Sequence, residues 1–157
     1  ETEAILGVLA WCEADHAQLL SSVALRYELN HNPHSMRKAF PEETLSKSVL
    51  AIAASNAAQE RARGYSAGGI KALDALHLAC AIAACADYFW TCDDRFLRRA
   101  KQVATGATRA VTPLELIRLI GQRHDIPRSL EKPQIVREGI GPAAFAAGRL
   151  SEYPEPL

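Results

Sequence analysis

The sequence predicts an α/β domain with a short parallel sheet. Helical and strand-like segments alternate along the chain, which is the pattern of strands joined by covering helices. Of the 157 residues, 48% are hydrophobic and 23% are charged, the profile of an ordinary globular protein and not of a disordered one. A chain of this length is about one domain.

The first elements follow from apolar spacing. Apolar residues recur at helical intervals over residues 3–14, which predicts an amphipathic helix. A brief strand fits residues 18–22. Ser22 can then cap a helix that runs toward the break at Pro33.

The next segment favours a second long helix. Pro41 and the two following acids are typical of a helix start, and the Arg-rich stretch before Gly64 is typical of its end. We therefore expect one helix over residues 41–64 and a loop over residues 65–69. Its inward side chains would be Leu45, Val49, Ile52 and Ala53.

The second half alternates more regularly. It predicts helices over residues 73–84 and 95–101 and strands over residues 88–91 and 108–111. Thr112 to Glu115 form a capping box with Pro113 at the first helical position, which begins a helix ending near Gly121.

The last part of the chain has a different character. Prolines recur after Arg123, so we divide the chain into a domain over residues 1–121 and a C-terminal extension over residues 122–157. We expect one small helix there, over residues 142–150, and no strand. The role of this extension is not indicated by the sequence.

Charge and cysteine usage exclude several classes. Eighteen basic residues balance 18 acidic ones, so an anionic ligand must be held by a local patch or by a metal. No apolar run is long enough to span a membrane, and the acidic start does not resemble a signal peptide. The four cysteines show no metal-binding spacing, which favours buried thiols in a reducing, cytoplasmic compartment.

Three acids stand out by position. Asp93 follows the predicted strand at 88–91, Asp74 begins the helix over 73–84, and Glu28 lies about two helical turns after the strand at 18–22. Ligands of parallel sheets bind outside the carboxyl ends of the strands. Asp74 as a helix-dipole partner and Asp93 as a turn residue are the structural alternatives.

Carboxylates that converge in one cleft repel each other unless a cation lies between them. No Lys or Arg stands inside these motifs, so a hard divalent cation is the natural candidate. Mg²⁺ or Mn²⁺ held by carboxylates supports phosphoryl chemistry by activating water.

Four segments, in order, resemble the PIN-domain family. Residues 20–28 read LSSVALRYE, residues 69–81 read GIKALDALHLACA, residues 86–97 read ADYFWTCDDRFL, and residues 111–117 read VTPLELI. The likeness covers roughly residues 3–120. It implies a three-layer α/β/α domain acting as a metal-dependent ribonuclease, often the toxin of a toxin–antitoxin pair, and it also implies a homodimer.

The resemblance assigns roles to individual residues. Glu28, Asp74 and Asp93 would be the catalytic, metal-binding acids, with Asp94 as an auxiliary acid. Thr91 would place a hydroxyl near the metal or its water. Family members carry one more Asp at the end of a first strand. This sequence has no such strand before its first helix, and Asp15 comes too late, so we expect that acid to come from before residue 1.

Basic residues and histidines offer weaker candidates. Arg95, Arg98 and Arg99 would contact the RNA backbone, and Arg37 and Lys38 could extend that surface; a solvated helix face is the alternative. His77 is interpreted as a core or hydrogen-bonding residue beside Asp74. His31 and His34 form an HxxH pattern, but Pro33 argues against zinc.

The sequence thus predicts a Mg²⁺- or Mn²⁺-dependent endoribonuclease with RNA as substrate, an antitoxin protein as a possible partner and no membrane association. A non-catalytic PIN-like module that binds RNA or protein, without the first acid, is the alternative. Cleavage of DNA is a third possibility, since nothing here reads a 2′-hydroxyl.

Overall fold

A computed structural model describes residues 2–31, 46–48, 50–123 and 134–137. The helices in this part of the chain are α1 (Thr2–Glu13), α2 (Val23–His31), α4 (Asn56–Ala67), α5 (Ala72–Ala83), α6 (Asp94–Ala100) and α7 (Pro113–Arg123). The strands are β1 (Gln18–Ser22), β2 (Leu50–Ile52), β3 (Tyr88–Trp90), β4 (Arg109–Val111) and β5 (Gln134–Arg137).

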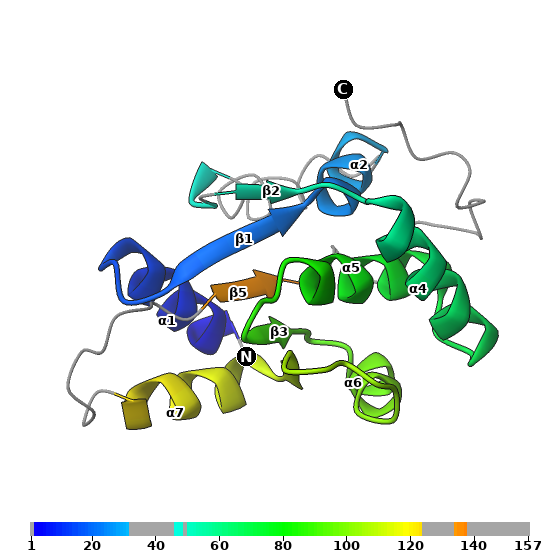
Figure 1. Cartoon of the computed structure of the whole chain (residues 1–157). Helices are drawn as coiled ribbons and strands as arrows, with labels where there is room; N and C mark the ends of the chain where they lie inside the picture. The colour runs from blue at the N-terminus through cyan, green and yellow to red at the C-terminus, as the bar shows by residue number, and fades with distance from the viewer. Residues whose placement is uncertain (1, 32–45, 49, 124–133, 138–157) are drawn as a thin grey trace.

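The strands form one parallel sheet, as predicted. Its order is β2-β1-β5-β3-β4, and every described pairing is parallel. All five strands therefore end at the same edge (Figure 1). Connections between parallel strands must cross over the sheet, and the intervening helices make those crossings.

Helices cover both faces of the sheet, which gives the expected three layers. Along β3, Phe89 packs into the cluster with α4 and α5, whereas Tyr88 and Trp90 pack on the other face with α1 and α7. β5 alternates in the same way: Val136 lies in the first cluster and Ile135 in the second. Two-residue alternation of side chains thus divides the core into two halves.

The predicted single helix over 41–64 is wrong in the part that the structure describes. Residues 50–52 form β2, paired with residues 20–22 of β1, and Ile52 is buried in the core. α4 begins only after Ser55, whose Oγ accepts a hydrogen bond from the Ala58 N–H at 3.2 Å. A three-residue apolar run matches helical and strand patterns equally. Residues 50–52 form a strand because they pair with β1.

Among the predicted inward-facing residues that the structure describes, only Ile52 is buried. Ala53 is exposed instead of inward-facing, and Leu45 and Val49 lie outside the described residues. α4 also continues through the predicted loop to Ala67, where the Gly68 N–H closes the helix on the carbonyls of Gly64 and Ser66.

The largest difference from the predicted elements is the strand β5. The sequence predicts strands only over residues 18–22, 88–91 and 108–111, yet β5 occupies the middle of the sheet between β1 and β3. Ile135 pairs with Leu19 on one side and Tyr88 on the other, and both Ile135 and Val136 are fully buried. Two apolar residues between polar neighbours are too short a signal to predict a strand. The predicted helix over 142–150 lies outside the described residues.

The cysteines are free thiols, but they are not all buried as predicted. Cys80 is buried and Cys12 partly buried, whereas Cys85 and Cys92 are exposed. Burial raises the pKa of the Cys80 thiol to about 12 and, with a smaller contribution from Glu13, that of Cys12 to about 11. Both therefore stay protonated near neutral pH. Among the described helices, none has the length and apolarity to cross a membrane.

Candidate functional site

The parallel topology brings the predicted acids toward one edge of the sheet. Asp93 lies three residues after the end of β3, and Glu28 lies in α2, which begins where β1 ends. α5 returns the chain to the start of β3, so its first turn, with Asp74, lies near the carboxyl ends of the strands. The fold therefore gathers residues that are far apart in sequence.

The electrostatic environment of Asp74 includes the other two acids. The pKa of Asp74 is raised, chiefly because the carboxyl is partly buried. His77 and Lys71 lower this pKa, whereas the carboxylates of Glu28 and Asp93 raise it. Each of these groups therefore lies near enough to act on the charge of Asp74.

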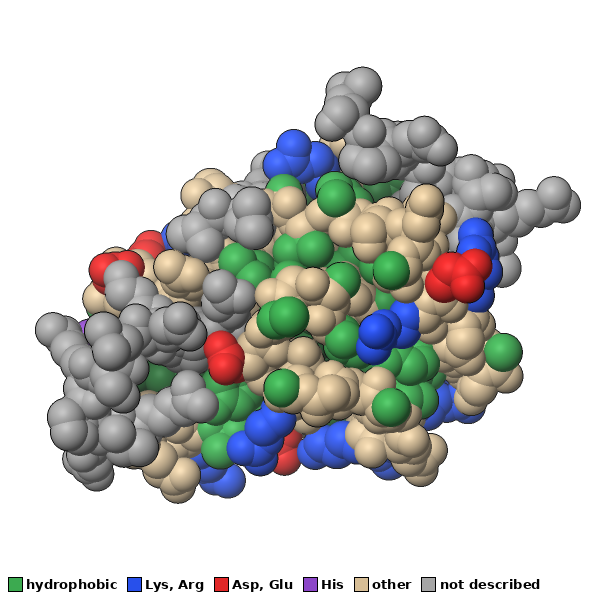
Figure 2. All heavy atoms as spheres, viewed as in Figure 1, with side chains coloured by type: hydrophobic (Ala, Val, Ile, Leu, Met, Phe, Trp, Pro, Cys, Tyr) green, Lys and Arg blue, Asp and Glu red, His purple; other side chains and the backbone are tan. Residues whose placement is uncertain are grey.

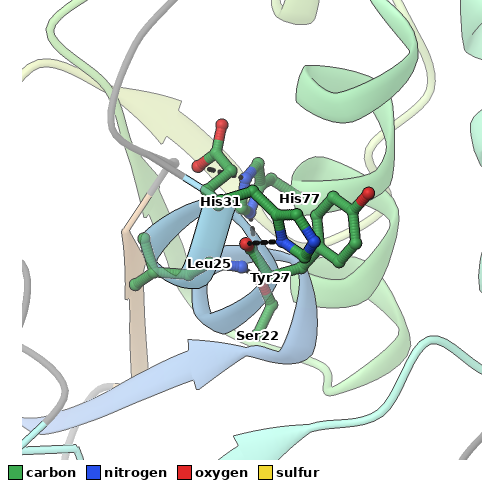
Figure 3. Close-up of polar contacts among 6 residues, drawn as sticks. Ser22, Leu25, Tyr27, His31 and His77 are labelled. Carbon is green, nitrogen blue, oxygen red and sulfur yellow. Dashed lines mark hydrogen bonds and ion pairs between the residues drawn. The ribbon is translucent and has the colours of Figure 1, made fainter. Parts of the chain in front are cut away.

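Glu28 is not presented to solvent. It is 4% exposed, and its Oε2 lies 3.2 Å from Nε2 of His77. The other ring nitrogen, Nδ1, lies 3.0 Å from Oγ of Ser22. Figure 3 shows Ser22 at the start of α2 with the ring of His77 beside it. The interpretation of His77 as a hydrogen-bonding residue is thus confirmed.

Asp93 has a local role as the N-cap of α6. Its Oδ1 accepts hydrogen bonds from the backbone N–H groups of Arg95 at 2.8 Å and Phe96 at 2.9 Å. Thr91 is buried, and its Oγ1 accepts from the Asp93 N–H at 2.9 Å. Asp94 is the exposed first residue of α6. Thr91 therefore stabilises the turn that contains Asp93. In this turn Asp93 acts as a helix N-cap.

The donor chemistry suits a hard cation, but the described side chains do not form a preassembled site. Three carboxylates supply the oxygen ligands that Mg²⁺ and Mn²⁺ prefer, and their mutual repulsion at Asp74 is of the kind that a cation relieves. Within residues 2–31, 46–48, 50–123 and 134–137, however, no group of three His, Cys, Asp or Glu side chains is arranged to hold a metal ion.

The predicted basic residues differ in their surroundings. Arg95 and Arg98 are exposed on α6, while Arg99 donates from Nη1 to the carbonyl of Gly69 and joins α6 to the turn before α5. Figure 2, in the orientation of Figure 1, shows Lys and Arg side chains along the edge where α6 and α7 lie. Arg37 and Lys38 lie outside the described residues.

A groove that the sequence did not predict lies beside α6 and α7. The groove measures about 500 Å³ and lies between the end of α6, β4 and α7. Lys101, Arg109 and Arg118 line it together with Glu115, and Lys101 forms an ion pair with Glu115 at 3.4 Å. These cations are separated along the chain, so no local sequence pattern predicts the groove.

Two groups that the sequence argued against, the HxxH histidines and Asp15, do not add to the candidate site in the part of the chain that the structure describes. The ring of His31 stacks on Tyr27 with centroids 4.1 Å apart, and its Nδ1 lies 2.9 Å from the Tyr27 carbonyl oxygen (Figure 3). His34 lies outside the described residues. Asp15 is exposed in the turn before β1, at the opposite edge of the sheet from the acids, so it cannot replace the additional acid expected from the resemblance.

Comparison with known families agrees with this architecture. The model of the PIN domain matches residues 7–102. The chain belongs to the PIN domain family. No curated protein and no solved structure matches the chain. The matched residues contain Glu28, Asp74 and Asp93, whereas β5 and α7 lie beyond them.

Membership has general implications for the site. PIN domains are generally nuclease modules that act on RNA and use divalent metal ions. The gathered carboxylates of this PIN domain are consistent with that class. The central strand β5 is the feature that neither the predicted elements nor the matched residues include.

Proposed function

We propose that this PIN domain is a metal-dependent endoribonuclease. The single observation that carries the proposal is that the parallel sheet brings Glu28, Asp74 and Asp93 toward the carboxyl ends of its strands. The pKa of Asp74 agrees with this placement, since it is raised chiefly by burial and further by the other two carboxylates. Proteins rarely keep such a group of like charges unless it binds a cation or performs chemistry. All three residues lie within the segments that resemble PIN-domain motifs.

Asp74, Asp93 and Glu28 would hold Mg²⁺ or Mn²⁺ in this proposal, with Asp94 as an auxiliary acid. A bound divalent cation supplies a water nucleophile at neutral pH and charge stabilisation at the phosphate. The protein residues orient that reaction: Thr91 holds the backbone of Asp93, and α6 extends from the same turn.

Phosphate contacts position a nucleic acid without reading its sequence. Arg95 and Arg98 are suited to this role because they are exposed on the helix that Asp93 caps. Arg99 would contribute less, since its guanidinium already binds the Gly69 carbonyl.

The test is cleavage of a fluorescent single-stranded RNA by the chain in Mn²⁺, with a DNA of the same base sequence beside it. EDTA and Asp74→Asn should each abolish cleavage, with a loss of at least about 100-fold because a catalytic ligand is removed. Glu28→Gln should behave likewise.

Glu60→Gln is the matched control for Glu28→Gln. Glu60 is 78% exposed and forms only a surface ion pair with Arg63 at 3.3 Å, so its variant should cleave as the wild type does. Cleavage that survives EDTA, or that Asp74→Asn leaves unchanged, would refute the proposal. Equal cleavage of RNA and DNA would mean that the protein is a nuclease without sugar preference and not a ribonuclease.

A non-catalytic PIN module that binds RNA or protein is the second candidate, and a specific observation favours it. Asp93 already caps α6, Glu28 already binds His77, and the described residues include no ready three-ligand group. RNA binding by a catalytically inactive wild-type chain, unchanged in Asp74→Asn, would support this alternative.

The resemblance to toxin members of the family suggests two partners. We propose a homodimer, and an antitoxin protein that would cover the acidic edge. Light scattering of the purified chain tests the first, since a dimer has twice the mass of the 17.1 kDa monomer. Inhibition of RNA cleavage by a co-expressed protein tests the second.

A further inference from the structure

A buried hydrogen-bond chain links the start of α2 to the candidate site. The backbone N–H of Leu25 donates to Oγ of Ser22 at 3.2 Å, Ser22 Oγ lies 3.0 Å from Nδ1 of His77, and His77 Nε2 lies 3.2 Å from Oε2 of Glu28. Ser22, His77 and Glu28 are 1%, 0% and 4% exposed. Water therefore does not compete for these contacts.

We propose that Ser22 and His77 are positioning residues that hold the Glu28 carboxylate in place beside Asp74. This inference rests on the proposed function, because it gives Glu28 a role that needs a defined orientation. Neither residue touches the reacting atoms in this proposal; both act through Glu28.

The donors and acceptors fit one direction along the chain. A carboxylate only accepts, so Nε2 of His77 carries the proton and donates to Glu28. In the neutral ring Nδ1 then accepts from the Ser22 hydroxyl, whose oxygen accepts from Leu25. Each hydrogen bond fixes the next, so the helix cap determines the tautomer of His77 and the ring determines the orientation of Glu28.

The placement of His77 favours this role over simple filling of the core. It lies one helical turn after Asp74 on α5, and its Nε2 reaches across to Glu28 on α2. An apolar residue would fill the same volume without burying two polar nitrogens, whose burial is costly when they are unpaired. The imidazole thus joins the helix that carries Asp74 to Glu28, 49 positions away from His77 in the sequence.

The test compares two amide variants that differ by one methylene group. In His77→Gln the amide nitrogen reaches the position of Nε2 and keeps the donor to Glu28. In His77→Asn the amide reaches only the position of Nδ1, so the contact with Ser22 is kept and the contact with Glu28 is lost. His77→Leu removes both contacts.

Mn²⁺ binding is measured by the electron paramagnetic resonance signal of the free ion, with thermal melting to establish that each variant is folded. Outer partners of metal ligands contribute about 10–100-fold to affinity, so His77→Leu and His77→Asn should weaken binding by that factor. His77→Gln should restore most of it. Equal affinities of folded Gln and Asn variants, or wild-type affinity in His77→Leu, would overturn the proposal.

A second measurement separates this inference from the proposed function. Long-range ¹H–¹⁵N spectra of the wild-type imidazole should show the proton on Nε2, and Glu28→Leu should shift that nitrogen's resonance. If the wild type binds no Mn²⁺ and cuts no RNA, the proposed function fails, and this spectrum still decides whether His77 holds Glu28. A proton on Nδ1 in the neutral ring, or no response to Glu28→Leu, would exclude the hydrogen-bond chain.

Discussion

The Glu28 carboxylate of α2 acts on the charge of Asp74, which lies in the first turn of α5. Burial is the largest cause of the raised pKa of Asp74, and the Glu28 carboxylate raises it further. The ionised form of Asp74 is therefore less favourable in the folded chain than in the unfolded one. The candidate site is a place where the fold holds an unfavourable charge.

Asp74→Asn should consequently raise the stability of the metal-free protein at neutral pH. A pKa that is higher in the folded state means that folding takes up a proton, so stability falls as the pH rises through the folded pKa. The neutral amide removes that loss. Thermal melting in EDTA at neutral pH measures the gain, which should disappear below the ordinary pKa of Asp, where both chains carry a neutral group.

Exposed Asp94 provides the matched comparison for this stability effect. Asp94 lies in the first turn of α6, where the helix dipole favours the negative charge of its carboxylate. Asp94→Asn should therefore leave the melting temperature unchanged or lower it slightly. A lower melting temperature for Asp74→Asn than for the wild type in EDTA would contradict the argument.

The position of β5 predicts that its apolar residues are essential to the fold. Ile135 is fully buried and pairs with strands on both sides. Ile135→Ala should lower the free energy of unfolding by about 2–5 kcal/mol, the range for large-to-small changes in a core. Urea denaturation measures this change.

Leu114→Ala is the control for the truncation of an apolar side chain. Leu114 is 52% exposed on α7, so its loss should change the free energy of unfolding by no more than about 0.5 kcal/mol. Similar small effects for Ile135 and Leu114 would show that β5 is not a central strand in solution.

The capping box of α7 predicts a pH-dependent contribution to stability. The Thr112 N–H donates to Glu115 Oε2 at 2.9 Å, and the Glu115 N–H donates to Thr112 Oγ1 at 3.0 Å. The hydrogen bond from the Thr112 backbone is the largest cause of the lowered pKa of Glu115. Thr112→Ala should cost about 1 kcal/mol, measured by urea denaturation at neutral pH, and Thr112→Ser should cost less.

The sign of the pH effect follows from the lowered pKa of Glu115. Its contribution is present above the ordinary pKa of Glu and is lost as the pH falls through the folded pKa. The difference in melting temperature between the wild type and Glu115→Gln should therefore shrink on acidification. A difference that grows toward low pH would exclude this interpretation.

The turn before α5 predicts an unequal cost for two glycine substitutions. Gly69 has a φ of +92°, and a Cβ there would lie 2.5 Å from Nη1 of Arg99. Gly106 also has a positive φ, but nothing lies within 4 Å of its added Cβ. Gly106→Ala should cost roughly 1–2 kcal/mol from the backbone alone.

Gly69→Ala should cost more than Gly106→Ala in the same denaturation experiment, since the contact between Arg99 and the Gly69 carbonyl must also rearrange. Arg99→Ala measures the loss of that contact without the backbone cost. Equal costs for the two glycine variants would show that Arg99 does not constrain the turn.

Local patterns predicted most elements and several caps. The residues of β1 matched the predicted strand at 18–22, and α5, β3, α6 and β4 were each predicted to within about two residues. Ser22 caps α2 as expected, and Thr112 and Glu115 form the predicted capping box. These features depend on residues a few positions apart, which is why the sequence alone specifies them.

Features that depend on distant partners were not predicted. β2 and β5 are three and four residues long, so their own patterns are weak, and each becomes a strand because β1 provides its hydrogen-bond partners. The groove between α6, β4 and α7 is similar, since its cations Lys101, Arg109 and Arg118 come from three separate parts of the chain.

Patterns in the sequence were enough to predict a PIN domain and to select three acids that could serve its chemistry. Helical periodicity and turn residues are short-range properties, and the motifs lie within single segments. The folded structure was needed to establish which strand lies in the middle of the sheet and that His77 lies beside Glu28. Those choices depend on burial and hydrogen bonding between residues such as Ser22 and His77, 55 positions apart, and no local pattern records such a contact.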